Sequence, residues 1–266
     1  MAVTAQILPA EDAGPQASSM DRKSENDAEN PKSKIQDPKS ELPSAGEILA
    51  QARAALPTEP LLIRGQILTG GRIGKLGRAC YLDMFMEFGE DPAMICCQLC
   101  DAFGTPFEKM NITVGEDCAA EFEYETGTPL KPAVAPSAGE SVLETDLAWN
   151  DLCLLFLWRA GGRTVRLENL RGRDCYVIEF AGDAAPIENR KSKIENKTFV
   201  WIDTQMMVPL QMEELDRENK PRRRMEVKSI KQISDQWMVK NMEIRSYPSK
   251  HHTLIRIDDV IIRPLR

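Results

Sequence analysis

The sequence is poor in the residues that most often carry catalysis. It has two histidines among 266 residues, and they are neighbours, His251 and His252. Because histidine is the usual acid–base group near neutral pH and a common metal ligand, this single pair severely limits both kinds of chemistry. Three motifs of common enzyme classes are also absent. They are a Gly-x-Ser-x-Gly motif, a phosphate-binding Gly-x-x-x-x-Gly-Lys-Ser/Thr loop and a Gly-x-Gly-x-x-Gly motif after a strand. The sequence therefore predicts a protein that is not an enzyme and holds no metal or cofactor.

Long apolar segments and an excess of positive charge are missing as well. No apolar run reaches the ~18–20 residues that cross a bilayer. Residues 1–9 lack the basic and apolar segments of a secretory signal, so the protein is either cytoplasmic or has lost its signal, and composition does not separate the two. The net charge of −7 argues against nucleic acid as the main partner. The basic run 220–224 is interpreted as a solvated hairpin turn.

Seven cysteines are present, an odd and scattered set that fits a disulfide framework poorly. Cys97 and Cys100 have CxxC spacing, but no second CxxC follows. In a strand, these two residues also point to opposite faces. We expect buried thiols that pack as small hydrophobic groups rather than a zinc or redox site.

The composition divides the chain into a tail and one domain. Residues 1–43 have no aromatic and few large apolar residues, which predicts a disordered tail, and residues 44–266 form the predicted domain. The domain begins with a Ser-x-x-Glu capping box, Ser44 to Glu47, directly before an apolar stripe at helical spacing. A short helix ending before Pro57 is therefore expected.

After Pro60 the apolar period changes from 3.6 to 2 for most of the chain, which indicates antiparallel strands. The stretch 197–247 divides into four extended runs with short polar separators, too short for helical crossovers, and so predicts a β-meander. The Pro- and Gly-containing segment 128–141 is the main internal loop. Residues 146–158 fit a buried helical turn with Asp146 as N-cap, but also a strand. The expected total is about ten or eleven strands and one or two helices.

Acidic residues give a weak indication of chemistry. The sequence offers one candidate cluster of carboxylates across a hairpin: Asp203, Glu213, Glu214 and Asp216. Glycoside hydrolysis needs a facing pair of carboxylates in a cleft. Turn and solvent-face carboxylates are the favoured interpretation. The histidine pair at a strand entry is likewise interpreted as a surface or sheet-edge feature.

Methionine is plentiful, with twelve residues in the chain. Nine lie in predicted strands: Met84, Met86, Met94, Met110, Met207, Met212, Met225, Met238 and Met242. Unbranched, polarizable Met side chains conform to irregular apolar guests, which favours a flexible binding surface. For each methionine taken singly, ordinary core packing is the favoured interpretation.

A series of short motifs resembles the outer-membrane lipoprotein-sorting protein family, which has the LolA-like lipoprotein-carrier fold. In chain order they are Asp146-x-x-x-x-Asp151-Leu152, Gly172-Arg-Asp-Cys175-Tyr176-Val-Ile, Val200-Trp201-Ile202-Asp203, Glu213-x-x-Asp216, Trp237-Met-Val-Lys-Asn-Met-Glu-Ile244 and His252-Thr253-x-Ile255. The match spans about residues 44–262. The family has no shared catalytic residues to carry over.

The resemblance implies a mainly β fold with one or two helices, in which a curved antiparallel sheet of about eleven strands forms an incomplete barrel with a helical lid. It implies a periplasmic, monomeric carrier of lipoprotein acyl chains or other lipids, with an inner-membrane export complex or an outer-membrane acceptor as partner. An envelope-associated regulatory or assembly module without lipid is the alternative. The expected apolar cavity and lid comprise Ile48, Leu49, Ile63, Ile67, Leu82, Met84, Met86, Phe122, Trp201, Met212, Met225, Trp237 and Met242.

Overall fold

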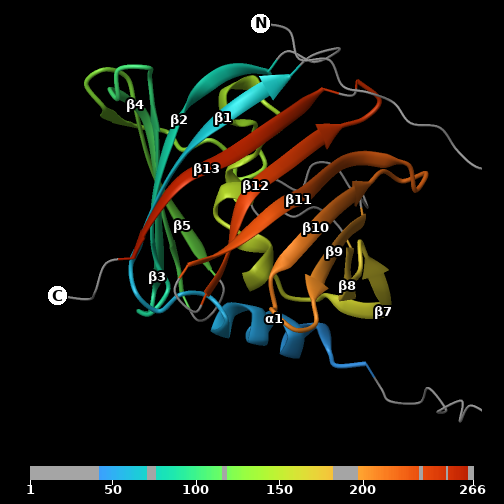
Figure 1. Cartoon of the computed structure of the whole chain (residues 1–266). Helices are drawn as coiled ribbons and strands as arrows, with labels where there is room; N and C mark the ends of the chain where they lie inside the picture. The colour runs from blue at the N-terminus through green and yellow to red at the C-terminus, as the bar shows by residue number, and fades with distance from the viewer. Residues whose placement is uncertain are drawn as a thin grey trace, which may run out of the picture. The chain divides into compact units, whose positions relative to one another are not determined.

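The computed structural model describes residues 42–70, 76–115, 119–181, 197–233, 236–249 and 251–262. Over these residues, thirteen strands form one antiparallel sheet in the order β6-β5-β4-β3-β2-β1-β13-β12-β11-β10-β9-β8-β7. The sheet is strongly curved but not closed into a barrel, because β6 and β7 remain at its two edges (Figure 1). The predicted fold class, an incomplete barrel with a helical cover, is confirmed.

The strands follow one another in the sheet except at one place. The first half of the domain runs through β1 (Leu61–Gly70), β2 (Leu76–Glu87), β3 (Ala93–Cys100), β4 (Pro106–Val114), β5 (Ala120–Thr126) and β6 (Lys131–Ala133). The second half runs through β7 (Arg163–Leu170), β8 (Arg173–Ala181), β9 (Lys197–Asp203), β10 (Pro209–Leu215), β11 (Pro221–Ile233), β12 (Gln236–Ser246) and β13 (His252–Ile262). The last strand pairs with the first, Ile67 opposite Ile255, and this joins the two meanders into one sheet.

Helical segments lie within the curve of the sheet and along one end of it. They are α1 (Ala45–Ala54), η1 (Val142–Glu144), α2 (Trp149–Leu152) and η2 (Leu155–Trp158). In Figure 1 the yellow-green segment that carries η1, α2 and η2 is enclosed by the sheet, and α1, in blue, lies below it. Residues 146–158 therefore form short helical turns rather than a strand.

Helix α1 begins where its capping box predicts. The Ser44 hydroxyl accepts a hydrogen bond from the Glu47 amide at 3.2 Å, and the Glu47 carboxylate accepts one from the Ser44 amide at 2.8 Å. These bonds satisfy two backbone donors that the first helical turn leaves unpaired, which fixes the start of the helix. The Glu47 carboxylate also accepts a hydrogen bond of 2.8 Å from the Ser44 hydroxyl, and the bonds from the Ser44 amide and hydroxyl lower the pKa of Glu47 because they stabilise its charged form.

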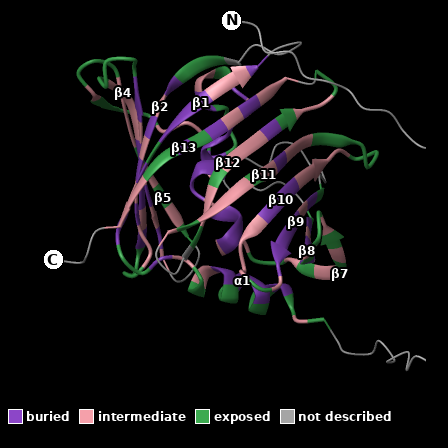
Figure 2. Ribbon diagram, viewed as in Figure 1, coloured by how far each residue is buried: buried purple, intermediate pink, exposed green. Residues whose placement is uncertain are grey.

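The strands have one apolar face, as their period of 2 predicts. On β1, Leu61, Ile63 and Ile67 are buried, and Arg64 is exposed. Figure 2 shows the resulting bands of buried and exposed residues across the sheet, and the buried segment inside its curve. We call the side that packs against the helical segments the inner face. Its side chains and those of the helical segments form the main hydrophobic core.

Two details differ from the sequence-based expectation. The strand count exceeds ten or eleven, and one added strand is the three-residue β6, which lies inside the segment interpreted as a loop. The division at residue 43 stays a prediction, because residues 1–41 lie outside the described part of the chain.

Candidate functional site

The inner face of the sheet is an extended apolar surface. Its fully buried side chains come from neighbouring strands, among them Ile67 on β1, Leu82 on β2, Leu99 on β3 and Ile112 on β4. Methionines contribute on both halves of the sheet: Met84, Met86, Met110, Met212 and Met225 are buried there, and Met207, Met238 and Met242 are partly buried. The surface therefore combines branched aliphatic groups with deformable thioethers.

Two segments cover this surface, and we call them together the cover: helix α1 and residues 142–158. Helix α1 contributes Ile48, Leu49 and Ala52, all buried in the core. Residues 142–158 contribute mainly large apolar side chains, including Val142, Leu147, Trp149, Leu152, Phe156 and Leu157.

Aromatic contacts join the cover to the sheet on its β2–β5 side. Trp149 meets Tyr124 of β5 edge-on with ring centroids 6.1 Å apart, and Trp158 stacks on Phe88 at 6.1 Å. Such pairs are worth about 0.5–1.5 kcal/mol beyond the area they bury. The cover is thus held to this part of the sheet by non-directional apolar contact.

Polar contacts fasten α1 at both of its ends. The guanidinium group of Arg53, in its last turn, donates a hydrogen bond to the carbonyl oxygen of Leu157. Before its first turn, the carbonyl oxygen of Pro43 accepts a hydrogen bond of 2.7 Å from the hydroxyl of Thr164 on β7. Helix α1 is therefore tied to η2 and to one edge of the sheet.

A buried ion pair fastens residues 142–158 to the opposite half of the sheet. The Asp151 side chain is fully buried and pairs with Arg223 of β11, whose side chain is 12% exposed. Arg223 also donates to Glu214 of β10 at 3.2 Å. Burial by itself would lower the pKa of Arg223. The carboxylates of Asp151 and Glu214 outweigh this effect and raise that pKa, so the guanidinium group stays charged.

Asp146, five residues before Asp151, forms a second polar anchor between the cover and the sheet. The Asp146 carboxylate accepts a hydrogen bond of 3.0 Å from the Thr253 hydroxyl and lies 2.5 Å from Nδ1 of His251. The Asp146 amide donates to the same hydroxyl at 3.0 Å, and its carbonyl oxygen accepts from Arg223 at 2.9 Å. Asp146 and Asp151 thus attach the cover to β11 and β13.

These anchors correct two interpretations of the sequence. Asp146 is not an N-cap, because α2 begins three residues later and its carboxylate binds β13 and the residue before it. The histidine pair lies at the entry of β13 and His251 is partly exposed, as expected of a surface feature, but β13 lies between β1 and β12 rather than at a sheet edge, and His251 contacts Asp146. The sequence reasoning gave no role to Arg223, and no local pattern distinguishes it from the other arginines of its run.

The expected cavity residues come together with two exceptions. Ile48, Leu49, Ile63, Ile67, Leu82, Met84, Met86, Met212 and Met225 are buried in the main core, and Phe122 and Met242 pack against it. Trp201 instead joins a second cluster with Cys175, Val177 and Leu210. Side chains alternate along β9, so Val200 and Ile202 take the inner face and Trp201 the outer face. Trp237 is 42% exposed and belongs to neither cluster. That the eleven others bind a ligand stays a prediction.

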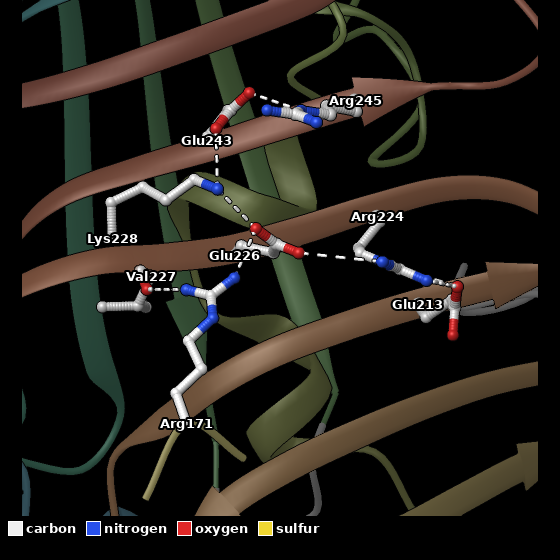
Figure 3. A network of polar contacts seen from close by, with 8 residues as sticks. All are labelled: Arg171, Glu213, Arg224, Glu226, Val227, Lys228, Glu243 and Arg245. Carbon is white, nitrogen blue, oxygen red and sulfur yellow. Dashed lines mark hydrogen bonds and ion pairs between the residues drawn. The ribbon is translucent and has the colours of Figure 1, made fainter. Parts of the chain in front are cut away.

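The outer face carries a network of ion pairs between neighbouring strands. Glu226 of β11 accepts hydrogen bonds from Arg171 at 2.7 Å and from Lys228 at 2.5 Å, and Lys228 reaches Glu243 of β12 at 2.8 Å (Figure 3). Burial acts to raise the pKa of Glu226 and of Glu243, but the bonds from their basic neighbours outweigh it and lower both.

The basic run and the acidic group therefore have structural roles. Arg223 and Arg224 lie within β11 rather than in a turn, and Arg224 binds Glu213 of β10 at 2.6 Å. Asp203 is buried and accepts hydrogen bonds from the Gln205 and Met206 amides at 2.9 and 2.7 Å, so it organises the turn after β9. The interpretation as turn carboxylates holds for Asp203 and for Asp216, which accepts hydrogen bonds from the Glu218 and Lys220 amides. It was wrong for Glu213 and Glu214, because strand pairing places them beside Arg224 and Arg223.

The cysteines on the described residues are free thiols, and most are buried. Cys97 is on the inner face, and Cys100 is buried at the end of β3, as expected for thiols that pack as hydrophobic groups. Burial raises the pKa of the Cys80 thiol to about 12. Within the described ranges, no three His, Cys, Asp or Glu side chains are grouped closely enough to hold a metal ion.

Comparison with known proteins places the chain in a family. The model of a family of uncharacterized proteins matches residues 133–265, which is half of the chain. The chain belongs to this DUF1329-like family. No curated protein matches the sequence significantly. The matched half contains residues 142–158 of the cover and strands β7 to β13, so it includes both polar anchors.

Solved structures share the fold at low sequence identity. A DUF1329 family protein from Desulfovibrio piger has a TM-score of 0.65 and 13% identity, over 82% of this chain and 91% of that one. A domain described as an outer membrane lipoprotein-sorting protein, from Vibrio parahaemolyticus, has a TM-score of 0.65 and 14% identity, over 82% and 92%. A LolA superfamily protein from Nitrosomonas europaea has 0.56 and 14%, over 85% and 96%. The fold of this DUF1329-like chain is therefore LolA-like.

Proposed function

We propose that this protein binds the acyl chains of lipoproteins or other lipids between the inner face of its sheet and the cover, and carries them without catalysing a reaction. The observation that supports this most directly is the construction of the cover. Its contact with the sheet is apolar over the β2–β5 half, and discrete polar anchors hold it elsewhere. Such a cover can separate from the apolar surface without breaking the sheet.

An acyl chain would be bound by the hydrophobic effect alone. Each CH₂ group removed from water contributes ~0.8 kcal/mol, so one long chain supplies roughly 10 kcal/mol before ordering costs. The methionines of the inner face would adjust to the chain, since their side chains are unbranched. A charged contact is unnecessary for affinity, which agrees with the apolar composition of the main core.

Uptake would require the cover to move. The side chains of the inner face are buried under α1 and residues 142–158 in this conformation, including Ile67 and Leu82 with no exposed surface. A ligand shifts such an equilibrium only by its difference in affinity for the two states. In this proposal the acyl chain replaces the apolar contacts that the cover loses when it moves. The cover turns about its polar anchors, which serve as the hinge.

The cellular setting follows from the same proposal. Lipid carriers of this fold would work in the bacterial envelope, so we place the protein in the periplasm, as a monomer that meets an inner-membrane export complex or an outer-membrane acceptor. No helix of the described residues is long and apolar enough to span a membrane.

The proposal is tested by the content of the purified protein and by direct binding. The full chain is expressed in a bacterial host, and native mass spectrometry with organic extraction measures co-purified lipid. A fluorescent fatty acid then measures affinity. We expect near-stoichiometric lipid and saturable binding. A protein that carries no lipid and shows no saturable binding of the probe would contradict the proposal.

A pair of variants on β12 localises the site. Met242 packs against the main core and Val239, on the same strand, belongs to neither cluster. Met242→Trp should weaken binding of the probe about tenfold, since overpacking typically costs 1–3 kcal/mol. Val239→Trp should leave binding unchanged. Equal effects of the two substitutions would argue that the lipid lies elsewhere.

An interaction module without lipid is the second candidate. The observation that favours it is the burial of most inner side chains, which leaves them already packed by the protein itself. In that case the protein would purify without lipid and act in the envelope through a partner protein. Lipid analysis therefore separates the two functions directly.

A further inference from the structure

A small pocket lies on the outer face of the sheet, between the turn that joins β7 to β8 and the strands β10 and β11. It has a volume of about 180 Å³ and is partly open to solvent, and we call it the outer pocket. Its apolar lining is Leu170 of β7, Leu210 of β10, and Val227 and Ile230 of β11. Leu210 belongs to the second cluster, and Leu170 and Val227 pack against that cluster. The outer pocket is therefore separate from the main core.

Irregular strand pairing shapes this pocket. Four consecutive residues of β11, 227–230, line it, although regular alternation would turn every second side chain to the other face. The register of β11 against β12 shifts twice between Val227 and Ile230, and the register of β10 against β9 shifts around Leu210. Bulges of this kind re-aim side chains and are over-represented beside active sites. Both strands thus give up regular pairing where they line the pocket.

The turn between β7 and β8 forms the opposite wall. Arg171 in this turn has a left-handed backbone, with φ of 55°, and the Asn169 side chain accepts a hydrogen bond of 2.9 Å from the Gly172 amide. The Arg171 guanidinium group donates to Glu226 of β11 at 2.7 Å (Figure 3). Strands β8, β9 and β10 lie between β7 and β11 in the sheet, so the turn reaches across the outer face.

The polar part of the lining is basic. It consists of Arg171, Arg173, Lys228 and Ser229. None of the eight described residues that line the pocket is acidic. The carboxylates paired with the two arginines are more deeply buried: the Glu226 and Asp203 side chains are 14% and 3% exposed, against 53% and 40% for Arg171 and Arg173. The carboxylates hold the cations in place, while the charge that faces solvent is positive.

Hydrogen-bond donors remain for a ligand. A guanidinium group carries five N–H bonds, and the contacts seen on the described residues use two from Arg171 and two from Arg173. The Ser229 hydroxyl accepts a hydrogen bond of 2.9 Å from Asn241, and its own O–H can donate to a ligand. The pocket therefore combines an apolar lining with fixed donors that carry positive charge.

We propose that the outer pocket binds a small carboxylate that carries an apolar group about the size of a benzene ring. The carboxylate pairs with Arg171 and Arg173, because the planar guanidinium group matches its geometry. The apolar group lies against Leu170, Leu210 and Ile230. An engineered cavity of about 150 Å³ binds benzene, so the outer pocket has room for such a group. An inorganic anion would leave the apolar lining uncovered, and a neutral molecule would leave the donors unused.

The test measures binding of benzoate to the full chain by isothermal titration calorimetry. Benzyl alcohol, which has the ring without the charge, and inorganic phosphate, which has charge without the ring, are the comparison ligands. We expect saturable benzoate binding at one site, at least about tenfold tighter than binding of either comparison ligand. Absence of saturable benzoate binding, or equal affinity for benzoate and either comparison ligand, would overturn the proposal.

Two arginines of the outer network supply a matched pair of variants. Arg171→Gln removes a lining cation and should weaken benzoate binding about tenfold, because a charge-assisted hydrogen bond is lost. Arg245→Gln is the control. The Arg245 side chain is 51% exposed, and its partner Glu243 keeps Lys228, just as Glu226 does in Arg171→Gln (Figure 3). Arg245 does not line the pocket, so benzoate affinity should not change. Equal losses in the two variants would overturn the proposal.

The proposal does not depend on lipid binding, because the two sites lie on opposite faces of the sheet. Arg171→Gln should leave the affinity for a fluorescent fatty acid unchanged. A protein that binds benzoate in this manner but no fatty acid would contradict only the proposed function. A protein that binds the fatty acid but not benzoate would contradict only the outer pocket.

Discussion

Replacing Asp151 by asparagine should loosen the cover and destabilise the whole domain. The substitution keeps the size of the side chain and its ability to accept the Ala148 amide hydrogen bond, which is 2.7 Å long. It removes the charge that faces Arg223. A guanidinium group that is 12% exposed would then lack its closest counter-ion.

The structure sets the expected magnitude. Breaking a buried ion pair typically costs about 3–5 kcal/mol, because the remaining charge stays buried. Arg223 keeps Glu214 at 3.2 Å and the Asp146 carbonyl oxygen at 2.9 Å, so the lower end, about 3 kcal/mol, applies. For a domain of this size, that loss lowers the thermal midpoint by about 6–12 °C.

Two assays check this prediction, one global and one local. Circular dichroism measures the midpoint, and hydrogen exchange measures opening of residues 142–158, which should accelerate about a hundredfold if the cover opens locally. Glu218→Gln is the matched control, because it breaks the fully solvated pair with Lys220 and should change stability by less than about 0.5 kcal/mol.

The reasoning has a clear point of failure. A midpoint within 2 °C of the wild-type value for Asp151→Asn, with unchanged exchange in residues 142–158, would show that the buried pair does not hold the cover. The double variant Asp151→Leu/Arg223→Met should recover most of the lost stability, since apolar groups of similar size often replace a buried ion pair without loss.

Two further predictions concern the sheet. A Cβ atom on Gly65 would lie 2.5 Å from the carbonyl oxygen of Arg256 on β13. Gly65→Ala should therefore lower the free energy of unfolding, measured with urea, by about 2–3 kcal/mol. Gly77→Ala is the near-neutral control, because the nearest atom to its added Cβ lies 3.9 Å away. The lowered pKa values of Glu226 and Glu243 mean that their contribution to stability is complete above the ordinary pKa of 4.5 and is lost as the pH falls through the lower folded-state values. The free energy of unfolding, measured from pH 6 to pH 3, should therefore fall less steeply below pH 4.5 in the double variant Glu226→Gln/Glu243→Gln than in the wild-type protein. Equal slopes for the two proteins would refute the role given to these carboxylates.

Local patterns predicted the elements of the fold well. The capping box at Ser44 fixed the start of α1, because it acts between residues three positions apart. The stretch 197–247 forms four antiparallel strands, β9 to β12, as its four extended runs predicted, and the period-2 pattern is seen in the alternating burial on β1. In each case the deciding interactions lie within one element or between neighbours in the chain.

Alternation along a single strand left one choice open, which only the folded sheet decided. On β9, Val200 and Ile202 take one face and Trp201 the other, and the sequence does not say which face is covered. The assembled structure places the two aliphatic residues on the inner face and Trp201 in the second cluster. A residue's face is local information, but burial depends on what packs against that face.

The sequence by itself determined a curved antiparallel sheet with a capped helix and an apolar face. The spacing of apolar residues, every 2 positions in strands and every 3.6 in helices, depends only on residues a few positions apart. Only the tertiary structure decided how that face is closed. Asp151 meets Arg223 across 72 positions of sequence, and Asp146 meets Thr253 across 107. Charged groups find such partners through strand order and curvature, which no short stretch of the chain contains.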